Sequence, residues 1–548
     1  MKTRVEVWRD LESRAFDVCV IGGGATGAGC ALDAQLREYK TVLLEAADFG
    51  GATSSASTKL AHGGVRYLER AVKKFDWKQY GVVREALRER RRMLNNAPHL
   101  AHAQEFLIPC FGRAEVLYYG LGTKLYEWMA GSDSLGRSRT LSRNGVVARL
   151  PDLKGAALQG GVLFTDGQFD DARFCLTLIK TFCNTDGTAI NYARVVRFEK
   201  TSDGKIAAAI VEDASSGKQA AVRARAFVNA TGPFSDSVRA MAIPKSQPRL
   251  VLSRGAHILL PLKHEGPALV IPKTEDGRII FAIPWMNRLL VGTTEEAVSS
   301  GEEISVTRQD AEYLLSHLNH YLAGEYSLAD IVSAFAGVRP LVRSKVSGST
   351  KDLAREHDVE IDESTGLVSI LGGKWTSYRA MAEDTIDVVQ NRLGARAPCS
   401  TQDHGLAGAE GYHRKLWQAM ASDGDLPEAT ARHLVSKFGS EASAVLSLGR
   451  KHPEWRTPIV AGSPAIQAEV VYCVREEMAV SVEDVLARRL GLQLYDWELA
   501  MKAAPIVAEL LGAELGWSTD QIWRGSQGYI EKLVRQKRLL QGDSSKHA

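Results

Sequence analysis

Apolar residues near the N-terminus form two short runs on either side of a glycine-rich turn. Residues 16–21 are largely apolar, which is typical of a strand buried on both faces of a parallel sheet. Glycines follow at five positions between 22 and 29, the composition from 25 to 39 is helical, and residues 41–45 predict a second strand. A strand, a helix and a strand within about 30 residues have the size of a parallel crossover unit.

The later parts of the chain show two other patterns. Short apolar runs separated by proline, glycine and charged residues predict an antiparallel sheet in the middle of the chain. These runs are 257–260, 278–283 and 289–291. Beyond residue 400 the pattern is helical, and two capping boxes, Ser481 with Asp484 and Ser518 with Gln521, predict helix starts.

Composition narrows the class of protein. Lys and Arg total 68 against 65 Asp and Glu, a net charge of +3, which lacks the surplus of a dedicated nucleic-acid binder. The seven cysteines contain no C-x-x-C pair, which argues against a disulfide framework or a zinc site. No run of about 18 apolar residues occurs, so we expect no transmembrane helix, while peripheral membrane binding stays open. We expect a reducing compartment, no metal and no nucleic-acid partner.

The glycines at 22, 24 and 27 form the pattern G-x-G-x-x-G between the first strand and the helix. Gly22 allows a tight turn, Gly24 lets the backbone approach a pyrophosphate, and Gly27 lets the helix pack close to the strand. The helix N-terminus offers free N–H groups to the phosphates, and Glu45 is placed to accept a hydrogen bond from a ribose hydroxyl. The alternative is a glycine-rich turn without a ligand, but the combined pattern favours a dinucleotide.

The stretch from 53 to 68 indicates which dinucleotide binds. Its sequence, TSSASTKLAHGGVRYL, resembles the signature of the FAD-dependent glycerol-3-phosphate dehydrogenases. Further motifs similar to that family follow in the family's order over nearly the whole chain. They are 229–233 (NATGP), 255–257 (GAH), 283–285 (IPW), 292–294 (GTT), 337–340 (GVRP), 372–374 (GGK) and 475–489 (REEMAVSVEDVLARR). The chain resembles the bacterial type, because it shows no EF-hand loop like that of the family's mitochondrial members.

This resemblance implies an α/β fold with three parts. A Rossmann-like FAD-binding domain would be assembled from separated segments, with an antiparallel-sheet substrate domain inserted into it and an all-helical C-terminal domain after it. We place the FAD-binding domain at 1–75, 150–235 and 335–400, the substrate-binding or cap domain at 76–149 and 236–334, and the helical domain at 401–548.

The resemblance also implies a reaction. The protein would oxidise sn-glycerol 3-phosphate to dihydroxyacetone phosphate by hydride transfer to noncovalently bound FAD, and the electrons would pass to a respiratory quinone. A phosphate monoester calls for cations, and the planar arginine fork can make two charge-assisted hydrogen bonds to it. The resemblance places the substrate-binding residues at Arg66, Tyr67, Arg339, Arg355 and Lys374.

Two histidines are candidate bases, because a neutral imidazole accepts a proton near physiological pH. His62 lies in the His-Gly-Gly turn, and His257 follows a glycine on a predicted strand. For each histidine the alternative is a purely structural role. The third catalytic candidate, Arg339, would steer the substrate hydroxyl by its charge without acting as the base.

The cofactor would contact several glycine-rich turns. At 372–373 two glycines would let the flavin approach the backbone, and the helix that follows would stabilise negative charge on the reduced flavin. The predicted cofactor-binding residues are Gly22, Gly24, Gly27, Glu45, Thr53, Ser54, Ser55, Lys59, His62, Gly63, Gly64, Thr231, Gly232, Gly372, Gly373, Lys374, Trp375 and Thr376.

Residues 116–129 are apolar and aromatic with a single Lys and a single Glu. They predict either a membrane-interface or quinone-proximal helix, or an ordinary core helix. With the resemblance, this favours peripheral contact at the cytoplasmic face of the inner membrane, or a cytoplasmic location. A homodimer is one option for the assembly.

Three other functions stay open: an oxidase that passes electrons to oxygen, a related FAD amine or amino-acid oxidase, and a dinucleotide sensor without activity. The basic residues Arg66, Arg339 and Lys374 favour a phosphorylated substrate over an amine.

Overall fold

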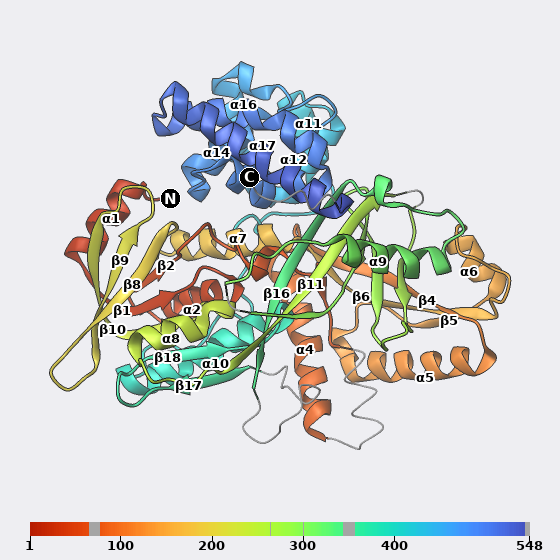
Figure 1. The fold of residues 1–548 in the computed structure, drawn as a ribbon, viewed down its shortest axis with the longest axis horizontal. Helices are drawn as coiled ribbons and strands as arrows, with labels where there is room; N and C mark the ends of the chain where they lie inside the picture. Colours follow the sequence, from red (N-terminus) through yellow and green to blue (C-terminus); the bar gives the residue numbers. More distant parts are fainter. Residues whose placement is uncertain (65–76, 263–264, 300, 344–356, 543–548) are drawn as a thin grey trace.

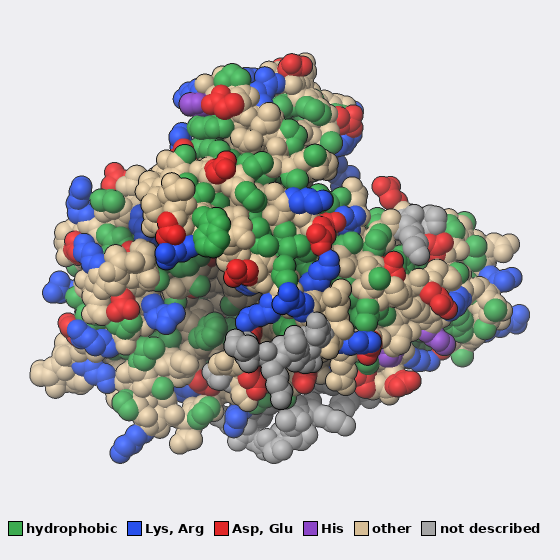
Figure 2. Space-filling model, turned by 45° about the horizontal axis from the view of Figure 1, so that its top comes forward, with side chains coloured by type: hydrophobic (Ala, Val, Ile, Leu, Met, Phe, Trp, Pro, Cys, Tyr) green, Lys and Arg blue, Asp and Glu red, His purple; other side chains and the backbone are tan. Residues whose placement is uncertain are grey.

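A computed structural model describes residues 1–64, 77–262, 265–299, 301–343 and 357–542. The predicted substrate residues Arg66, Tyr67 and Arg355 lie outside the described residues. Two sheets stand side by side in Figure 1, with the helical C-terminal domain above them. Acidic and basic side chains are interspersed over the face drawn in Figure 2, in keeping with the small net charge.

The first sheet has a parallel centre, as the apolar run at 16–21 predicts. Strand β1 is buried from Phe16 onward and pairs in parallel with β10 and β2. Its buried residues are apolar except Asp17, which fits a strand covered on both faces. The strand order is β17 (Asp358–Ile361), β18 (Val368–Leu371), β10 (Gln219–Asn229), β1 (Ala15–Ile21), β2 (Thr41–Leu44) and β7 (Thr188–Ile190), with β9 (Ile206–Asp213) antiparallel to β10 and β8 (Ala193–Lys200) antiparallel to β9.

Helix α2 (Ala25–Leu36) is the crossover between β1 and β2, as predicted. It is buried over most of its length and packs between α7 (Asp171–Asn184) and α10 (Tyr378–Leu393). Two further helices, α1 (Arg4–Ser13) and α8 (Ser235–Ala242), also contact strands of this sheet.

The second sheet is antiparallel except where β12 pairs with β4. Its order is β15 (Glu296–Val298), β11 (Leu250–Pro261), β14 (Arg288–Gly292), β13 (Ile280–Trp285), β12 (Ala268–Ile271), β4 (Ala101–Cys110), β6 (Gly160–Phe169) and β3 (Leu60–Ala61), with β16 (Ser333–Val342) on β11 and β5 (Arg139–Ser142) on β6. The helices near it are α4 (Trp77–Asn96), α5 (Arg113–Ala130), α6 (Arg143–Arg149) and α9 (Arg308–Tyr321).

Three strands from the predicted FAD-binding domain are part of the second sheet. Strand β6 pairs with β4, β16 pairs with β11, and β3 pairs with β6, although residues 60–61, 160–169 and 335–342 were all placed in the FAD-binding domain. Backbone pairing between strands far apart in sequence has no local signal. We therefore propose that these three strands belong to the substrate domain.

The C-terminal part is all-helical, as predicted. The Ser518 and Gln521 capping box is present at the start of α17. The side chains of Ser481 and Asp484 accept hydrogen bonds from each other's backbone N–H groups in the turn that leads into a π-helical segment at 484–489. The helices are α11 (Leu416–Gly424), α12 (Glu428–Phe438), α13 (Ala442–Lys451), α14 (Gln467–Glu477), α15 (Leu492–Tyr495), α16 (Trp497–Leu515) and α17 (Thr519–Gln541).

Buried ion pairs join this helical domain to the first sheet. Arg488 and Arg489 both bind the carboxylate of Asp48 in the loop after β2, at 2.5 and 2.7 Å, and Arg173 of α7 binds Glu477 at 2.8 Å. Burial disfavours a charged Asp48, but the two arginines outweigh it and hold the pKa of Asp48 well below its usual value. Residues of the helical C-terminal domain therefore hold the loop that follows Glu45 in place.

Candidate active site

The glycine-rich turn after β1 is held by close backbone packing. Gly22 has a φ of +109°, and a Cβ atom there would lie 2.6 Å from the carbonyl oxygen of Ala230. A Cβ at Gly27 would lie only 1.8 Å from the carbonyl oxygen of Gly22. A side chain at Gly27 would force helix α2 away from the turn, and a side chain at Gly22 would collide with the backbone that follows β10.

The carboxylate of Glu45 braces this turn. It accepts hydrogen bonds from the N–H groups of Gly23 and Ala47, at 2.6 and 2.8 Å. Burial raises the pKa of Glu45, although these backbone donors oppose the shift. In this structure the predicted ribose-binding carboxylate thus also holds the backbone that would face the pyrophosphate.

Residues 53–55, which form the short 3₁₀ helix η1 (Thr53–Ser55), connect three distant segments. The Ser54 hydroxyl accepts a hydrogen bond from the N–H of Ala25 at 2.9 Å, which places it at the N-terminus of α2. The Ser54 carbonyl accepts one from Nε1 of Trp375 at 2.9 Å, and the Thr53 hydroxyl donates to the carbonyl of Val338 at 2.6 Å. The fold thus places the predicted cofactor residues Thr53, Ser54 and Trp375 next to the N-terminus of α2.

Lys59, a predicted cofactor-binding residue, has contacts within the protein that the sequence did not indicate. Its side chain is fully buried, and its ammonium group pairs with Asp171 at 2.5 Å and donates to the carbonyl of Ser55 at 3.0 Å. In this structure the charge of Lys59 is therefore balanced by Asp171, at the start of α7, and stabilises the loop that contains η1.

The turn that contains His62, Gly63 and Gly64 is called here the flavin-side turn. The His62 N–H donates to the hydroxyl of Thr376 at 3.1 Å, and Gly64 has a φ of +80°. Thr376 belongs to η6 (Trp375–Ser377), which follows two glycines in the left-handed region, Gly372 at +72° and Gly373 at +93°. The predicted residues of both segments are thus brought together.

A third predicted turn follows β10. The Thr231 hydroxyl donates to the side chain of Asn229 at 2.7 Å, and Gly232 has a φ of +55° with open space where a Cβ would be. The open space at Gly232 leaves room for a cofactor to approach the backbone, whereas Cβ atoms at Gly22 and Gly373 would meet Ala230 and Met381 of the protein itself. A dinucleotide would be held by the turn at 22–27 and by η1, and its ring system by the flavin-side turn and the segment 372–376.

His257 lies on β11 and is only 2% exposed. Its Nε2 atom is 3.0 Å from the hydroxyl of Thr58, its ring stacks on Phe335 at a centroid distance of 4.7 Å, and Nδ1 has no hydrogen-bond partner among the described residues. Burial lowers the pKa of His257 well below its usual value, and the positive charges of Arg339 and Lys59 lower it further. The ring is therefore neutral at physiological pH.

Arg339 lies on the neighbouring strand β16, where Ser253 of β11 is its paired residue. Its guanidinium group donates a hydrogen bond to the hydroxyl of Thr293 at 3.1 Å. A Cβ atom at Gly255 would lie 2.7 Å from that guanidinium group, so the glycine of the GAH motif leaves room for the arginine in its present position. The second sheet thus carries a neutral histidine and, on the neighbouring strand, an arginine close enough to lower its pKa.

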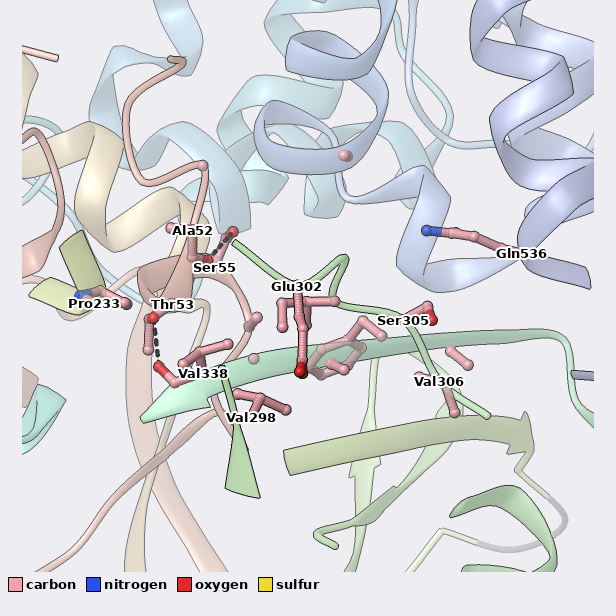
Figure 3. A pocket seen from close by; sticks show the side chains of 18 of the residues that line it. Ala52, Thr53, Ser55, Pro233, Val298, Glu302, Ser305, Val306, Val338 and Gln536 are labelled. Atoms are coloured by element: carbon pink, nitrogen blue, oxygen red, sulfur yellow. Dashed lines mark hydrogen bonds between the residues drawn. The ribbon is translucent and has the colours of Figure 1, made fainter. Parts of the chain in front are cut away.

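A cavity of about 360 Å³ borders η1 on the side that faces the helical C-terminal domain (Figure 3). It extends from Thr53 and Val338 past Glu302 to Gln536 of α17. The loop that carries predicted cofactor residues therefore lies between the dinucleotide turn and a space shared with the helical domain.

Three residues of this region were not singled out from the sequence. Thr58 lies in the stretch 53–68 and Thr293 in the motif 292–294, so a hydroxyl group within a family motif is a signal that indicates both residues. Their hydroxyl groups contact His257 and Arg339. Tyr126 contacts Gly63 from a helix more than 60 residues away, and nothing local in the sequence indicates that contact.

Comparisons with known proteins agree with this geometry. Residues 17–379 match the family described as "FAD dependent oxidoreductase", and residues 399–522 match "C-terminal domain of alpha-glycerophosphate oxidase". The mitochondrial glycerol-3-phosphate dehydrogenase of Mesocricetus auratus is 38% identical over 517 residues, which cover 92% of this chain and 71% of that protein. The probable mitochondrial glycerol-3-phosphate dehydrogenase of Caenorhabditis elegans is 38% identical over 533 residues, which cover 95% of this chain and 74% of that protein.

A solved structure is similar over the whole chain. The glycerol-3-phosphate dehydrogenase from Bacillus halodurans, complexed with FAD, superposes with a TM-score of 0.79 at 27% identity and covers 98% of this chain and 97% of its own. The cofactor of the matching family is FAD, and the turns described here fit it. The chain therefore belongs to the FAD-dependent glycerol-3-phosphate dehydrogenase family.

Proposed function

We propose that this protein oxidises sn-glycerol 3-phosphate to dihydroxyacetone phosphate with FAD as the oxidant, and that a membrane quinone takes the electrons. The observation that carries this proposal is the neutral His257 beside Arg339 on neighbouring strands of the second sheet. A proton acceptor and a cation for phosphate are what this reaction needs from the protein. The relatives support the same substrate by their names.

His257 is the proposed base. Thr58 fixes its Nε2 atom, and Nδ1 is the ring atom without a partner among the described residues, so Nδ1 would take the proton of the C2 hydroxyl. When bound, FAD supplies the acceptor for the hydride that leaves C2. The hydrogen bond that Arg339 donates to the Thr293 hydroxyl would hold the guanidinium group in position for the substrate. His62 is the alternative base, because it belongs to the flavin-side turn.

The phosphate group would be bound by cations from several segments. Arg339 is described by the structure, and Lys374 precedes η6, directly after the two left-handed glycines. On the strength of the sequence resemblance, Arg66 and Arg355 would add two further cations, and Tyr67 would contact the substrate as a neutral hydrogen-bonding group.

Anaerobic bleaching of the flavin absorption tests the proposal. Glycerol 3-phosphate should bleach the spectrum of the holoprotein, whereas glycerol, glycine and other amino acids at the same concentration should not. Faster bleaching by an unphosphorylated amine would contradict the substrate, and no bleaching by any compound would favour a binding protein without activity.

An oxidase is the second candidate, because residues 399–522 match a domain named for alpha-glycerophosphate oxidase. The reduced protein is mixed either with a soluble quinone analogue under nitrogen or with air-saturated buffer. Rapid reoxidation by the quinone analogue with little peroxide supports the dehydrogenase. Stoichiometric peroxide with no quinone reduction supports the oxidase.

Helix α5 offers a surface for a membrane. Four large side chains on it are exposed: Leu117 by 64%, Tyr118 by 48%, Leu121 by 64% and Trp128 by 68%. We call these four residues the apolar face of α5. The helix runs along the edge of the molecule opposite the helical domain in Figure 1, and Trp and Tyr are favoured at membrane interfaces. Among the described residues no helix is long and apolar enough to span a bilayer.

We therefore propose peripheral contact through the apolar face of α5, at the cytoplasmic face of an inner membrane where quinone is found. Leu121→Asp should reduce co-sedimentation with vesicles of anionic phospholipid several-fold. The matched control is Leu539→Asp, an exposed leucine on α17 that is 37% accessible. Equal losses in both variants would contradict this docking surface. Light scattering of the same samples distinguishes a homodimer from a monomer.

A further inference from the structure

Helix α5 faces two different environments. Its apolar face is exposed, whereas Tyr126 on the other side of the helix is only 3% exposed. The Tyr126 hydroxyl accepts a hydrogen bond from the N–H of Gly63 at 2.7 Å and donates one to the carboxylate of Asp166 at 2.8 Å. The directions follow because an amide N–H only donates and an ionised carboxylate only accepts. Tyr126 therefore joins α5 to the flavin-side turn.

Two charged residues hold the Tyr126 hydroxyl in place. Asp166 lies on β6, and its other carboxylate oxygen pairs with Arg90 of α4 at 2.8 Å. Arg90 also donates to the carbonyl of Asp133, three residues after the end of α5, at 2.8 Å. Burial, together with the negative charge of Asp166, raises the pKa of Tyr126 well above its usual value, so the hydroxyl keeps its proton. Helices α4 and α5 and strand β6 thus meet at one buried phenol.

The flavin-side turn is packed tightly against this phenol. A Cβ atom at Gly63 would lie 2.9 Å from the Tyr126 hydroxyl and 2.7 Å from Cγ of Leu87. The preceding N–H, that of His62, donates to the hydroxyl of Thr376 at 3.1 Å. Two consecutive N–H groups are therefore fixed by hydroxyl groups from different elements, α5 and η6. Removing either hydroxyl leaves a buried backbone donor without its partner, which is costly.

We propose that Tyr126 is a positioning residue through which α5 holds the flavin-side turn in the shape that FAD requires. The same helix carries the apolar face proposed to contact the membrane, so a single rigid element connects that surface with the cofactor site. Tyr126 itself is too far inside the protein to contact lipid, and the positioning role does not depend on membrane binding.

The test compares Tyr126→Phe with Tyr119→Phe in the holoprotein, in buffer without lipid. Tyr119 lies on the same helix seven residues earlier and packs against the apolar cluster of β4, β6 and β13 instead. Tyr126→Phe should release FAD on heating or dilution roughly tenfold faster, the effect of one lost buried hydrogen bond, and should shift the visible absorption bands of the bound flavin. Anaerobic bleaching by glycerol 3-phosphate should slow in parallel. Tyr119→Phe should match the unmodified protein in all three measurements.

Equal FAD release and identical flavin spectra in the two variants would overturn the proposal. If Tyr126→Phe fails to fold, Asp166→Asn replaces it, since it keeps the side-chain volume and weakens the acceptor of the same hydroxyl. An Asp166→Asn spectrum and FAD release like those of the unmodified protein would then also overturn it. Vesicle co-sedimentation of both tyrosine variants is measured separately, so failure of membrane docking is distinguishable from failure of this role.

Discussion

The glycine-rich turn at 22–27 and the strands that carry His257 and Arg339 hold their shapes by different contacts. In the turn, the close contacts are backbone against backbone, as between Gly27 and Gly22. On β11 and β16, side chains hold other side chains, Thr58 on His257 and Thr293 on Arg339. Adding a methyl group should therefore be most damaging in the turn, and removing a functional group should be most damaging on the strands.

The largest expected effect is that of Gly27→Ala. Its Cβ would lie 1.8 Å from the carbonyl oxygen of Gly22, and backbone cannot move aside as a flexible side chain can. We expect a loss of roughly 3 kcal/mol or more of stability and loss of bound FAD. Thermal unfolding and the ratio of flavin to protein absorbance measure both. The control is Gly528→Ala on α17, where a Cβ meets nothing within 4 Å and neither measurement should change. Normal FAD content in the Gly27→Ala variant would contradict the importance of the backbone contact.

The next effect is that of Arg339→Ala, which removes the cation beside His257. Hydrogen bonds to charged groups contribute about 1.5–3 kcal/mol each, so losing two to a phosphate should lower kcat/KM roughly 100-fold or more. FAD content should stay normal, because Arg339 is proposed to bind the substrate and not the cofactor. Arg339→Lys keeps the charge but not the planar fork, and should recover only part of the loss. Loss of FAD with an unchanged KM would contradict this assignment.

The pH dependence of stability tests the neutral state of His257. Its pKa in the folded protein lies well below the value of 6.5 expected in the unfolded chain. Above pH 6.5 the ring is neutral in both states and its contribution to stability is complete. As the pH falls below 6.5, only the unfolded chain binds the proton, so this contribution falls by up to about 1.4 kcal/mol per pH unit. Urea unfolding between pH 8 and pH 5 gives the free energy of unfolding of the unmodified protein and of the His257→Gln variant. If the two free energies depend on pH in the same way, the ring is not held neutral.

The smallest expected effect is that of Thr58→Val, which removes the hydroxyl partner of His257 and changes little else in volume. A neutral hydrogen bond contributes about 1 kcal/mol, so the rate of anaerobic bleaching should fall roughly fivefold. Thr201→Val removes an exposed hydroxyl far from the site and should change nothing. If the two variants bleach at the same rate, Thr58 does not orient the base.

Local patterns predicted the dinucleotide half of the site well. The crossover of β1, α2 and β2, the need for glycine at 22 and 27, and the all-helical C-terminal part were all indicated by spacing within short windows. The pairing of β3, β6 and β16 within the second sheet was not indicated by any short pattern. Pairing between distant strands depends on which surfaces of the folded chain meet. For the same reason the partner of Lys59 was missed, since Asp171 is 112 residues away.

Sequence alone determined where the backbone must be free of side chains and which residues could carry the chemistry, since turn geometry and residue type are local properties. Only the tertiary structure decided the states and partners of those residues. Burial makes His257 neutral, the pairing of β11 with β16 brings Arg339 beside it, and α5 brings Tyr126 to Gly63. These properties come from segments that are far apart along the chain, because the dielectric environment and the contacts of a residue are set by what packs around it.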